Sequence, residues 1–258
     1  MTRPLALITG ASSGIGAAFA RALAARGYDL ILVARRQSRL EELAAELAAA
    51  HGTRAEVLPA DLLDEVGLRL VEARAEALDL LVNNAGFGVH GFFWETDAEA
   101  QDKMHRLHVV ATSRLSHAAL PGMVARGRGA IVNVSSVAGF LPAAISSTYG
   151  ATKCWMNAFT EGLSLELKTA GSPVKVQALC PGFTYTEFHD VAGMDRGVIP
   201  AWLWLKAEDV VAASLDGLER GTLFVVPGWI YKLIVRLVPA LPRFVRNPAI
   251  IRFARRRG

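Results

Sequence analysis

Short apolar runs alternate along the chain with longer stretches in which apolar residues recur every three or four positions. The short runs are rich in branched side chains, as buried strands are, whereas the longer stretches have the period of amphipathic helices. The pattern predicts strands over 5–9, 29–34, 55–59, 79–84, 130–136, 174–180 and 223–227. It predicts helices near 14–26, 37–50, 62–77, 98–126, 147–170 and 207–219.

Apolar strands separated by helices are typical of a parallel sheet that is covered on both faces. We therefore predict an α/β fold, a Rossmann-like doubly wound parallel sheet of about seven strands in a three-layer α/β/α arrangement. A sheet of this kind binds its ligand at the carboxyl ends of its strands.

The predicted organisation is one domain followed by a tail. No repeat, linker or change in composition marks a boundary before residue 220, so residues 1–227 are predicted to form a single Rossmann-like domain. Within this domain, residues 183–206 form a long segment, or excursion, that is rich in aromatic residues and interrupted by Gly and Pro. Its length and composition predict an active-site lid or substrate loop. Residues 228–258 form a basic, amphipathic C-terminal extension.

The composition favours a cytoplasmic protein. The chain has 258 residues, of which 52% are hydrophobic, so it is too apolar to be disordered. Its two cysteines, Cys154 and Cys180, are too few for a disulfide framework and do not have metal-ligand spacing. The N-terminus reads as a strand rather than an export signal. From Arg220 onward there are nine Lys or Arg and no Asp or Glu, so the basic excess lies in the tail.

A glycine-rich turn, "TGASSGIG", follows the first predicted strand and opens the first predicted helix. Glycines at such a turn let backbone amides approach a pyrophosphate and place the positive helix N-terminus beside it. The spacing of Gly10, Gly14 and Gly16 departs from the usual dinucleotide fingerprint, and a purely structural turn is the alternative. The position between strand and helix favours a dinucleotide site.

Two arginines follow the second predicted strand. An acidic residue at this position would hold the adenosine ribose of NAD, but the sequence places Arg35 and Arg36 there. Guanidinium groups suit a 2′-phosphate, so NADP(H) is favoured over NAD(H). The alternative is a solvated arginine pair at a helix entry.

Tyr149 and Lys153 lie four positions apart at the start of the helix predicted over 147–170. Residues at this spacing share a helix face, so the lysine charge can lower the pKa of the tyrosine toward the working range. An exposed tyrosine beside a solvated lysine is the alternative. Ser135 and Ser136 end the fifth predicted strand and therefore face the same crevice, where a hydroxyl can hold a substrate oxygen.

Taken together, "TGASSGIG", "NNAG", "NVSS", "YGATK" and "PGFTYT" resemble, in order and approximate spacing, the motifs of short-chain dehydrogenases/reductases over about residues 4–227. The resemblance implies an oxidoreductase that interconverts a carbonyl and an alcohol by hydride transfer. It makes Tyr149 the general acid or base, has Ser136 orient the reacting oxygen, and has Lys153 lower the tyrosine pKa and bind the nicotinamide ribose. It implies a cofactor set of Gly10, Ser12, Ser13, Gly14, Ile15, Gly16, Arg35, Arg36, Asp61, Asn83, Ala85, Gly86, Tyr149, Lys153, Pro181, Gly182, Thr184 and Thr186.

One position departs from the family pattern. The family's fourth catalytic residue is an asparagine in the helix before the fifth strand, and His108 stands there in this chain. A neutral imidazole also donates and accepts hydrogen bonds, so we hypothesise that His108 preserves the proton relay with an altered pH dependence. The alternative is a packed core histidine. A cofactor-binding sensor or scaffold that lacks turnover is the alternative to an enzyme.

The substrate is less constrained. Five apolar residues of the excursion predict a pocket for a lipophilic carbonyl compound, or else fill core: Phe188, Met194, Ile199, Trp202 and Trp204. The resemblance also implies a homodimer or homotetramer formed through the helices at 98–126 and 147–170.

The tail is interrupted by Lys232, Arg236, Pro239 and Pro242, so it is not expected to span a bilayer. Its apolar residues alternate with basic ones, as in a helix that lies at an anionic membrane surface. A helix packed over the domain or at a subunit interface is the alternative. Nucleic-acid binding is not expected, since no recognition module accompanies the basic residues.

Overall fold

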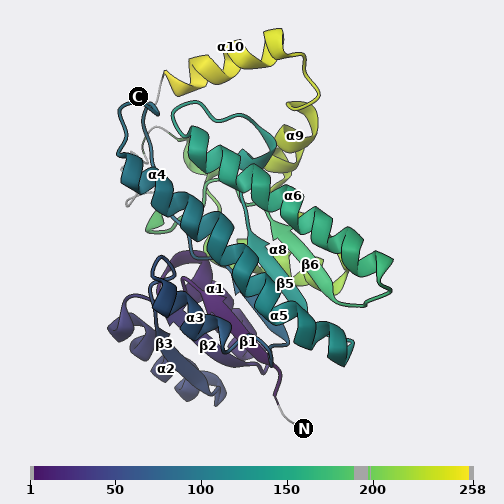
Figure 1. Ribbon diagram of the computed structural model, residues 1–258. Coiled ribbons are helices and arrows are strands. Elements are labelled where there is room, and N and C mark those ends of the chain that lie inside the picture. Colours follow the sequence, from purple (N-terminus) through teal and green to yellow (C-terminus); the bar gives the residue numbers. More distant parts are fainter. Residues whose placement is uncertain (1–2, 189–196, 198, 256–258) are drawn as a thin grey trace.

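The fold of the chain is a single parallel sheet with helices on both faces (Figure 1). The computed structural model describes residues 3–188, 197 and 199–255. The seven strands are ordered β3-β2-β1-β4-β5-β6-β7, which confirms the predicted doubly wound architecture. The strands are β1 Leu5–Thr9, β2 Asp29–Ala34, β3 Ala55–Pro59, β4 Leu80–Asn83, β5 Ala130–Val134, β6 Lys175–Leu179 and β7 Phe224–Val225.

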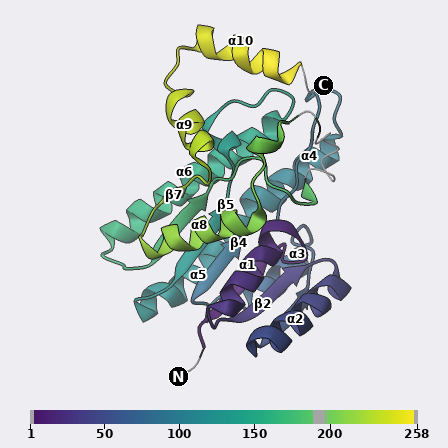
Figure 2. The ribbon, with the colours of Figure 1, turned by 180° about the vertical axis from the view of Figure 1, so that it is seen from behind.

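Two hydrophobic cores lie on opposite faces of this sheet. One packs the helices α1 (Gly14–Ala25), α2 (Gln37–His51) and α8 (Ala207–Glu219) against it (Figure 2). The opposite face is covered by α3 (Glu65–Glu72), α5 (Thr112–Arg126) and α6 (Ser147–Thr169). Burial on both faces explains why the central strands read as continuous apolar runs.

The helix predicted over 98–126 is interrupted. It begins at α4 (Ala98–His105), where the Asp97 carboxylate accepts from the amides of Glu99 at 3.2 Å and Ala100 at 3.1 Å. A π-helical segment, Arg106–Ala111, then separates α4 from α5. Such segments are frequent at functional sites because they re-aim side chains, and this one carries His108.

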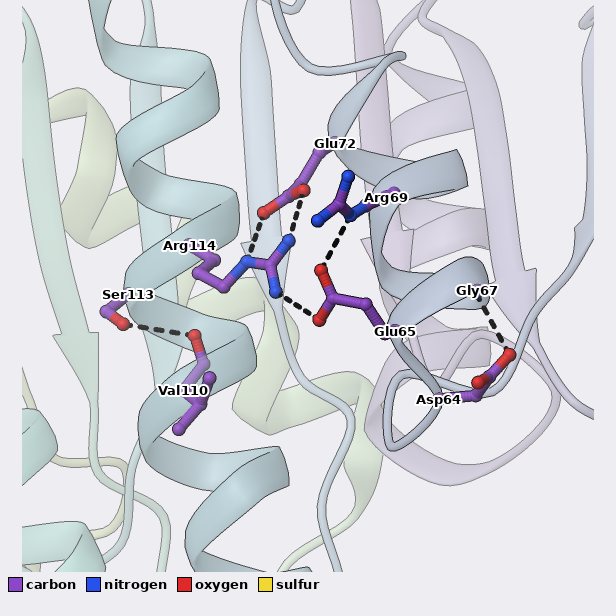
Figure 3. A network of polar contacts seen from close by, with 8 residues as sticks. All are labelled: Asp64, Glu65, Gly67, Arg69, Glu72, Val110, Ser113 and Arg114. Atoms are coloured by element: carbon purple, nitrogen blue, oxygen red, sulfur yellow. Dashed lines mark hydrogen bonds and ion pairs between the residues drawn. The ribbon is translucent and has the colours of Figure 1, made fainter.

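An ion-pair network fixes α3 against α5 (Figure 3). The Arg114 guanidinium binds both carboxylate oxygens of Glu72, at 2.6 and 2.7 Å, and one of Glu65 at 2.6 Å. Together with Arg69, it lowers the pKa of Glu65 to about 2. Helix α3 begins at Glu65, shortly after Asp61, so the network also supports the segment by which Asp61 lines the site described below.

The C-terminal extension lies beyond the carboxyl edge of the sheet, as α9 (Trp229–Leu237) and α10 (Arg243–Ala254) (Figures 1 and 2). Tyr231 attaches α9 to the domain. Its hydroxyl accepts from the Phe183 amide at 3.1 Å and donates to the Leu203 carbonyl at 2.6 Å. Among the helices of the described residues, none has the length and apolar character that crossing a membrane requires.

Candidate active site

A cavity of about 660 Å³ opens at the carboxyl edge of the sheet, where the fold predicts the ligand. We call it the carboxyl-edge cavity. Most of the site residues expected from the sequence line it: Gly10, Ser12, Ser13, Gly14, Ile15, Arg35, Arg36, Asp61, Ala85, Gly86, Ser136, Tyr149, Lys153, Pro181, Gly182, Thr184 and Thr186. The described structure therefore gathers seven separate segments of the chain around one space.

The glycine turn forms a cradle that side chains would fill. Gly10 and Gly14 have positive φ angles of 68° and 55°, which L side chains rarely adopt. Gly16 lies behind the turn, and a Cβ there would press against the Gly10 carbonyl oxygen. Helix α1 begins at Gly14, so its N-terminal amides face the cradle. This geometry fits a nucleotide pyrophosphate.

The two arginines reach the cavity from the end of β2, and both are exposed. The Arg36 guanidinium donates to the Ser12 hydroxyl, from Nε at 3.2 Å and from Nη2 at 3.0 Å. Its Nη1 pairs with the Glu187 carboxylate at 2.8 Å. Asp61 also lines the cavity, and its carboxylate accepts from the Leu63 amide at 3.0 Å. Arg36 is therefore positioned as an anion ligand.

Asn83 needs a correction. It was expected in the cofactor set, but it is buried in the sheet and does not line the cavity. Its amide donates to the Asn133 carbonyl oxygen at 2.9 Å and to the Ser116 hydroxyl at 3.2 Å, which braces β4 against β5 and α5. The next residue, Asn84, lines the cavity and donates to the Thr9 carbonyl at 2.8 Å.

Ser136 and Tyr149 meet at the reacting end. The Ser136 hydroxyl accepts from the Ala138 amide at 3.1 Å and lies 3.5 Å from the Pro181 carbonyl, to which it donates. Tyr149 is in the first turn of α6. Burial raises the pKa of Tyr149 to about 12, against a smaller lowering by its hydrogen bond with Ser136. The tyrosine is therefore a protonated hydroxyl at neutral pH.

Lys153 lies beside this pair. Its ammonium donates to the Val134 carbonyl at 2.8 Å and lies 5.7 Å from the Tyr149 ring centroid. Burial lowers the pKa of Lys153 to about 8. The expectation that this lysine brings the tyrosine pKa toward neutrality differs from the structure, in which burial dominates and the tyrosine pKa rises.

His108 is buried behind the cavity rather than in its lining. Its Nε2 lies 3.3 Å from the Phe87 amide and accepts from it, which requires Nδ1 to carry the proton and donate to the Thr152 hydroxyl at 2.9 Å. The Thr152 hydroxyl donates in turn to the Tyr149 carbonyl at 2.9 Å. Burial, with the nearby Lys153 charge, lowers the pKa of His108 well below 6.5. The imidazole is neutral, and its relay role stays a hypothesis.

Replacing His108 by asparagine tests that hypothesis. If the imidazole carries protons, the His108→Asn enzyme should keep its fold and show a pH profile of turnover shifted by about half a unit or more. The His108→Ala variant should lose about 2 kcal/mol of unfolding free energy, because the half-buried Phe87 amide loses its acceptor. Unchanged turnover and pH profile in both variants would leave His108 a core residue.

The aromatic excursion is only partly at the cavity. Phe188 lines it, with its ring centroid 5.7 Å from that of Tyr149. Ile199 and Trp204 are buried together instead, joined by a bond from the Trp204 indole to the Ile199 carbonyl at 3.2 Å, and Trp202 is exposed. Met194 lies outside the described residues. The expected pocket set is therefore reduced to Phe188 among the described members.

Sequence reasoning missed several lining residues, notably Asn84, Phe87, His90 and Glu187. Asn84 adjoins the expected "NNAG" position, so the motif indicated the segment but not the side chain. Glu187 had no local signal, because its partner Arg36 is distant in the sequence.

Comparisons with known proteins agree with this arrangement. The sequence model of a family described as "short chain dehydrogenase" matches residues 4–196. A short-chain dehydrogenase from Sphingobium yanoikuyae, solved in complex with NADPH, is 38% identical with a TM-score of 0.84, and 96% of this chain and 95% of that chain are covered. A short chain dehydrogenase/reductase from Burkholderia phymatum in complex with NAD is 28% identical with a TM-score of 0.83, over 95% and 96% of the two chains. A bulky-bulky ketone specific alcohol dehydrogenase from Comamonas testosteroni is 32% identical with a TM-score of 0.79, over 98% and 92%.

Proposed function

Because the chain belongs to the short-chain dehydrogenase family, we propose that it is an NADP(H)-dependent oxidoreductase that interconverts a lipophilic ketone or aldehyde and its alcohol. The solved neighbours hold NADPH in one case and NAD in another, which supports a nicotinamide cofactor without selecting one. The choice of NADP(H) depends on Arg35 and Arg36 at the end of β2, where an acidic residue would favour NAD.

The observation that carries the proposal is the convergence of Ser136, Tyr149 and Lys153 in the carboxyl-edge cavity, together with the glycine cradle. The bound cofactor supplies the hydride. The protein supplies the proton and the positioning: Tyr149 holds a proton on its phenol oxygen at neutral pH and gives it to the carbonyl oxygen as negative charge develops there. Ser136 holds the same oxygen, and the Lys153 ammonium stabilises the phenolate that remains.

A lipophilic substrate suits the apolar part of the cavity lining. Phe87, Val89 and Phe188 belong to it, and the Phe188 ring centroid lies 5.7 Å from that of Tyr149. The solved neighbour that prefers bulky ketones supports this class.

The first experiment is NADPH consumption by the purified protein across aldehydes, ketones, steroids and acyl-chain carbonyls, with NADH in parallel. Turnover with at least one apolar carbonyl and a preference for NADPH is the expected result. Tight NADPH binding without turnover of any substrate would instead favour a nucleotide-binding sensor or scaffold. Turnover with NADH alone would overturn the NADP(H) assignment.

The pH dependence of reduction should follow Lys153 rather than Tyr149. Because burial lowers the Lys153 pKa to about 8, its ammonium is lost as the pH rises through that value, whereas Tyr149 stays protonated up to about 12. We expect kcat/KM for reduction to be level near neutrality and to fall by up to about tenfold per unit above pH 8. Lys153→Arg, which keeps its charge at high pH, should move the fall to higher pH if it folds normally. A level profile up to about pH 10 would contradict this assignment.

A homo-oligomer is proposed through α5 and α6. An apolar groove of about 460 Å³ runs between them, lined by His117, Leu120, Val124, Leu163 and Leu167 among others. Val124 is 43% exposed and Leu165 on α6 is 59% exposed, as expected of helices that pack against a second copy. Sedimentation velocity of the wild type and of Val124→Glu tests this proposal, and a monomeric wild type would overturn it.

We also propose that the protein is cytoplasmic and that it contacts anionic membranes through its tail. Trp229, Leu233 and Leu237 share the outer face of α9 and are 71%, 47% and 57% exposed. Lys232 and Arg236 flank them, and no acidic residue follows Arg220 in the sequence. An apolar face with basic flanks suits an anionic lipid surface better than a second copy, whose identical charges would repel.

Co-sedimentation with vesicles tests the membrane contact. Phosphatidylserine-containing vesicles should bind the protein, and Lys232→Glu/Arg236→Glu should release it. Pure phosphatidylcholine vesicles are the control for charge. No binding to either kind of vesicle would overturn the proposal.

A further inference from the structure

Three consecutive residues, Thr186, Glu187 and Phe188, line the carboxyl-edge cavity. Thr186 packs on the phosphate loop, where a Cβ on Gly14 would meet its Cγ2 at 2.9 Å. Glu187 pairs with Arg36 at the end of β2. Phe188 packs near the ring of Tyr149. The segment thus touches the glycine cradle, the arginine pair and the reacting end at once.

The Glu187 carboxylate forms an ion pair with the Arg36 guanidinium, on the side that could otherwise bind a phosphate. The Arg36 Nη1 to Glu187 Oε2 distance is 2.8 Å, while Nε and Nη2 of the same arginine hold Ser12. The Arg36 guanidinium is the main group that lowers the pKa of this carboxylate, and Ser13 and Arg39 lower it further. The carboxylate is therefore ionised and seated among the groups that would receive a phosphate.

The pair is easily opened. Its side chains are 45% and 47% exposed, and ion pairs at such exposure contribute little to stability. A dianionic phosphate that approaches Arg36 meets a carboxylate already in place and must displace it, because two anions cannot share one guanidinium edge without repulsion. A nucleotide with a free ribose 2′-hydroxyl has no such conflict at Arg36.

On these grounds we propose that Glu187 is a specificity-determining residue that competes with the cofactor's 2′-phosphate for Arg36 and so narrows the discrimination between NADPH and NADH. The inference rests on the proposed function, since it concerns the same nucleotide site. The two residues have opposite effects on cofactor affinity: Arg36 favours binding of the 2′-phosphate, whereas Glu187 weakens it.

Nucleotide binding by Glu187→Gln, measured by calorimetry, tests the inference without any substrate. Glutamine keeps the shape of the side chain and removes its charge. We expect NADPH and 2′,5′-ADP to bind about fivefold more tightly than to the wild type, and NADH and 5′-AMP to change by less than about twofold. The gain should shrink as salt is added. It should vanish when Arg36→Ala is combined with Glu187→Gln, because the competition acts through Arg36.

Glu46→Gln is the matched control. Glu46 pairs with Arg21 at 2.7 Å with similar exposure, on α2 and α1, and neither residue lines the cavity. Equal or weaker NADPH binding by Glu187→Gln, or an equal gain for NADH, would overturn the inference. A wild type that binds NADH as tightly as NADPH would overturn the NADP(H) preference alone, since the variant's shift in the ratio decides the role of Glu187. A wild type that binds neither nucleotide would overturn the proposed function and the inference with it.

Discussion

Replacing Tyr149 by phenylalanine should lower kcat for carbonyl reduction by about a thousandfold. The substitution removes only the phenol oxygen, which is hydrogen-bonded to Ser136 and is the proposed proton donor. The ring that packs against His108 and Phe188 is kept, so the shape of the cavity is preserved. NADPH affinity should stay within about threefold of the wild type, because the glycine cradle and the arginines are untouched.

Steady-state kinetics and calorimetry on the same preparation check this prediction. Tyr28→Phe is the matched control, since Tyr28 lies between α1 and β2 at the amino edge of the sheet and should leave kcat unchanged. A Tyr149→Phe variant that retained a tenth or more of wild-type turnover would show that the proton comes from elsewhere.

A methyl group at Gly16 should damage both folding and nucleotide binding. In Gly16→Ala the added Cβ presses on the Gly10 carbonyl and lies 2.7 Å from the Asn84 amide nitrogen. That side-chain amide donates to the Thr9 carbonyl, so the added methyl group would shift the glycine turn away from the end of β1. We expect a loss of about 1–3 kcal/mol in unfolding free energy and at least a tenfold loss of NADPH affinity.

Thermal denaturation and nucleotide titration measure the two effects. Gly162→Ala in α6 is the matched control, because a Cβ there meets nothing within 4 Å and should stabilise the helix by about 0.5–1 kcal/mol. Wild-type NADPH affinity in Gly16→Ala would show that the glycine turn is not the phosphate cradle.

Much of the fold was predictable because its strands are defined by local pattern. β1, β2 and β3 begin and end where the apolar runs do. The strand expected over 223–227 is shortened to Phe224–Val225, because the pairing of β7 with β6 extends over these two residues. The π-helical segment was not predictable, because the apolar spacing of 98–126 continues through it.

The lining of the carboxyl-edge cavity was predictable where a motif fixes both the segment and the side chain, as at Tyr149 and Lys153. The lining was less predictable where the direction of a side chain decides whether it faces the cavity. Asn83 belongs to β4 and is directed at Asn133 of β5, whereas Asn84, one position later, lies past the strand end and lines the cavity. Glu187 required knowledge of which distant residue its loop approaches.

Tyr231 has a consequence for any shortened version of this protein. The match to the family ends at residue 196, which invites a cut after β7 to obtain a minimal domain. Such a cut would remove Tyr231, whose hydroxyl accepts a hydrogen bond from the Phe183 amide. It would also remove the Tyr231 ring, which packs so closely on Gly182 that a Cβ there has no room. Gly182, which lines the carboxyl-edge cavity, would then lose the Tyr231 ring that it packs against. A truncated protein that lost activity would therefore suggest missing substrate-binding residues, whereas the cause would be the loss of the Tyr231 contacts that support one wall of the carboxyl-edge cavity.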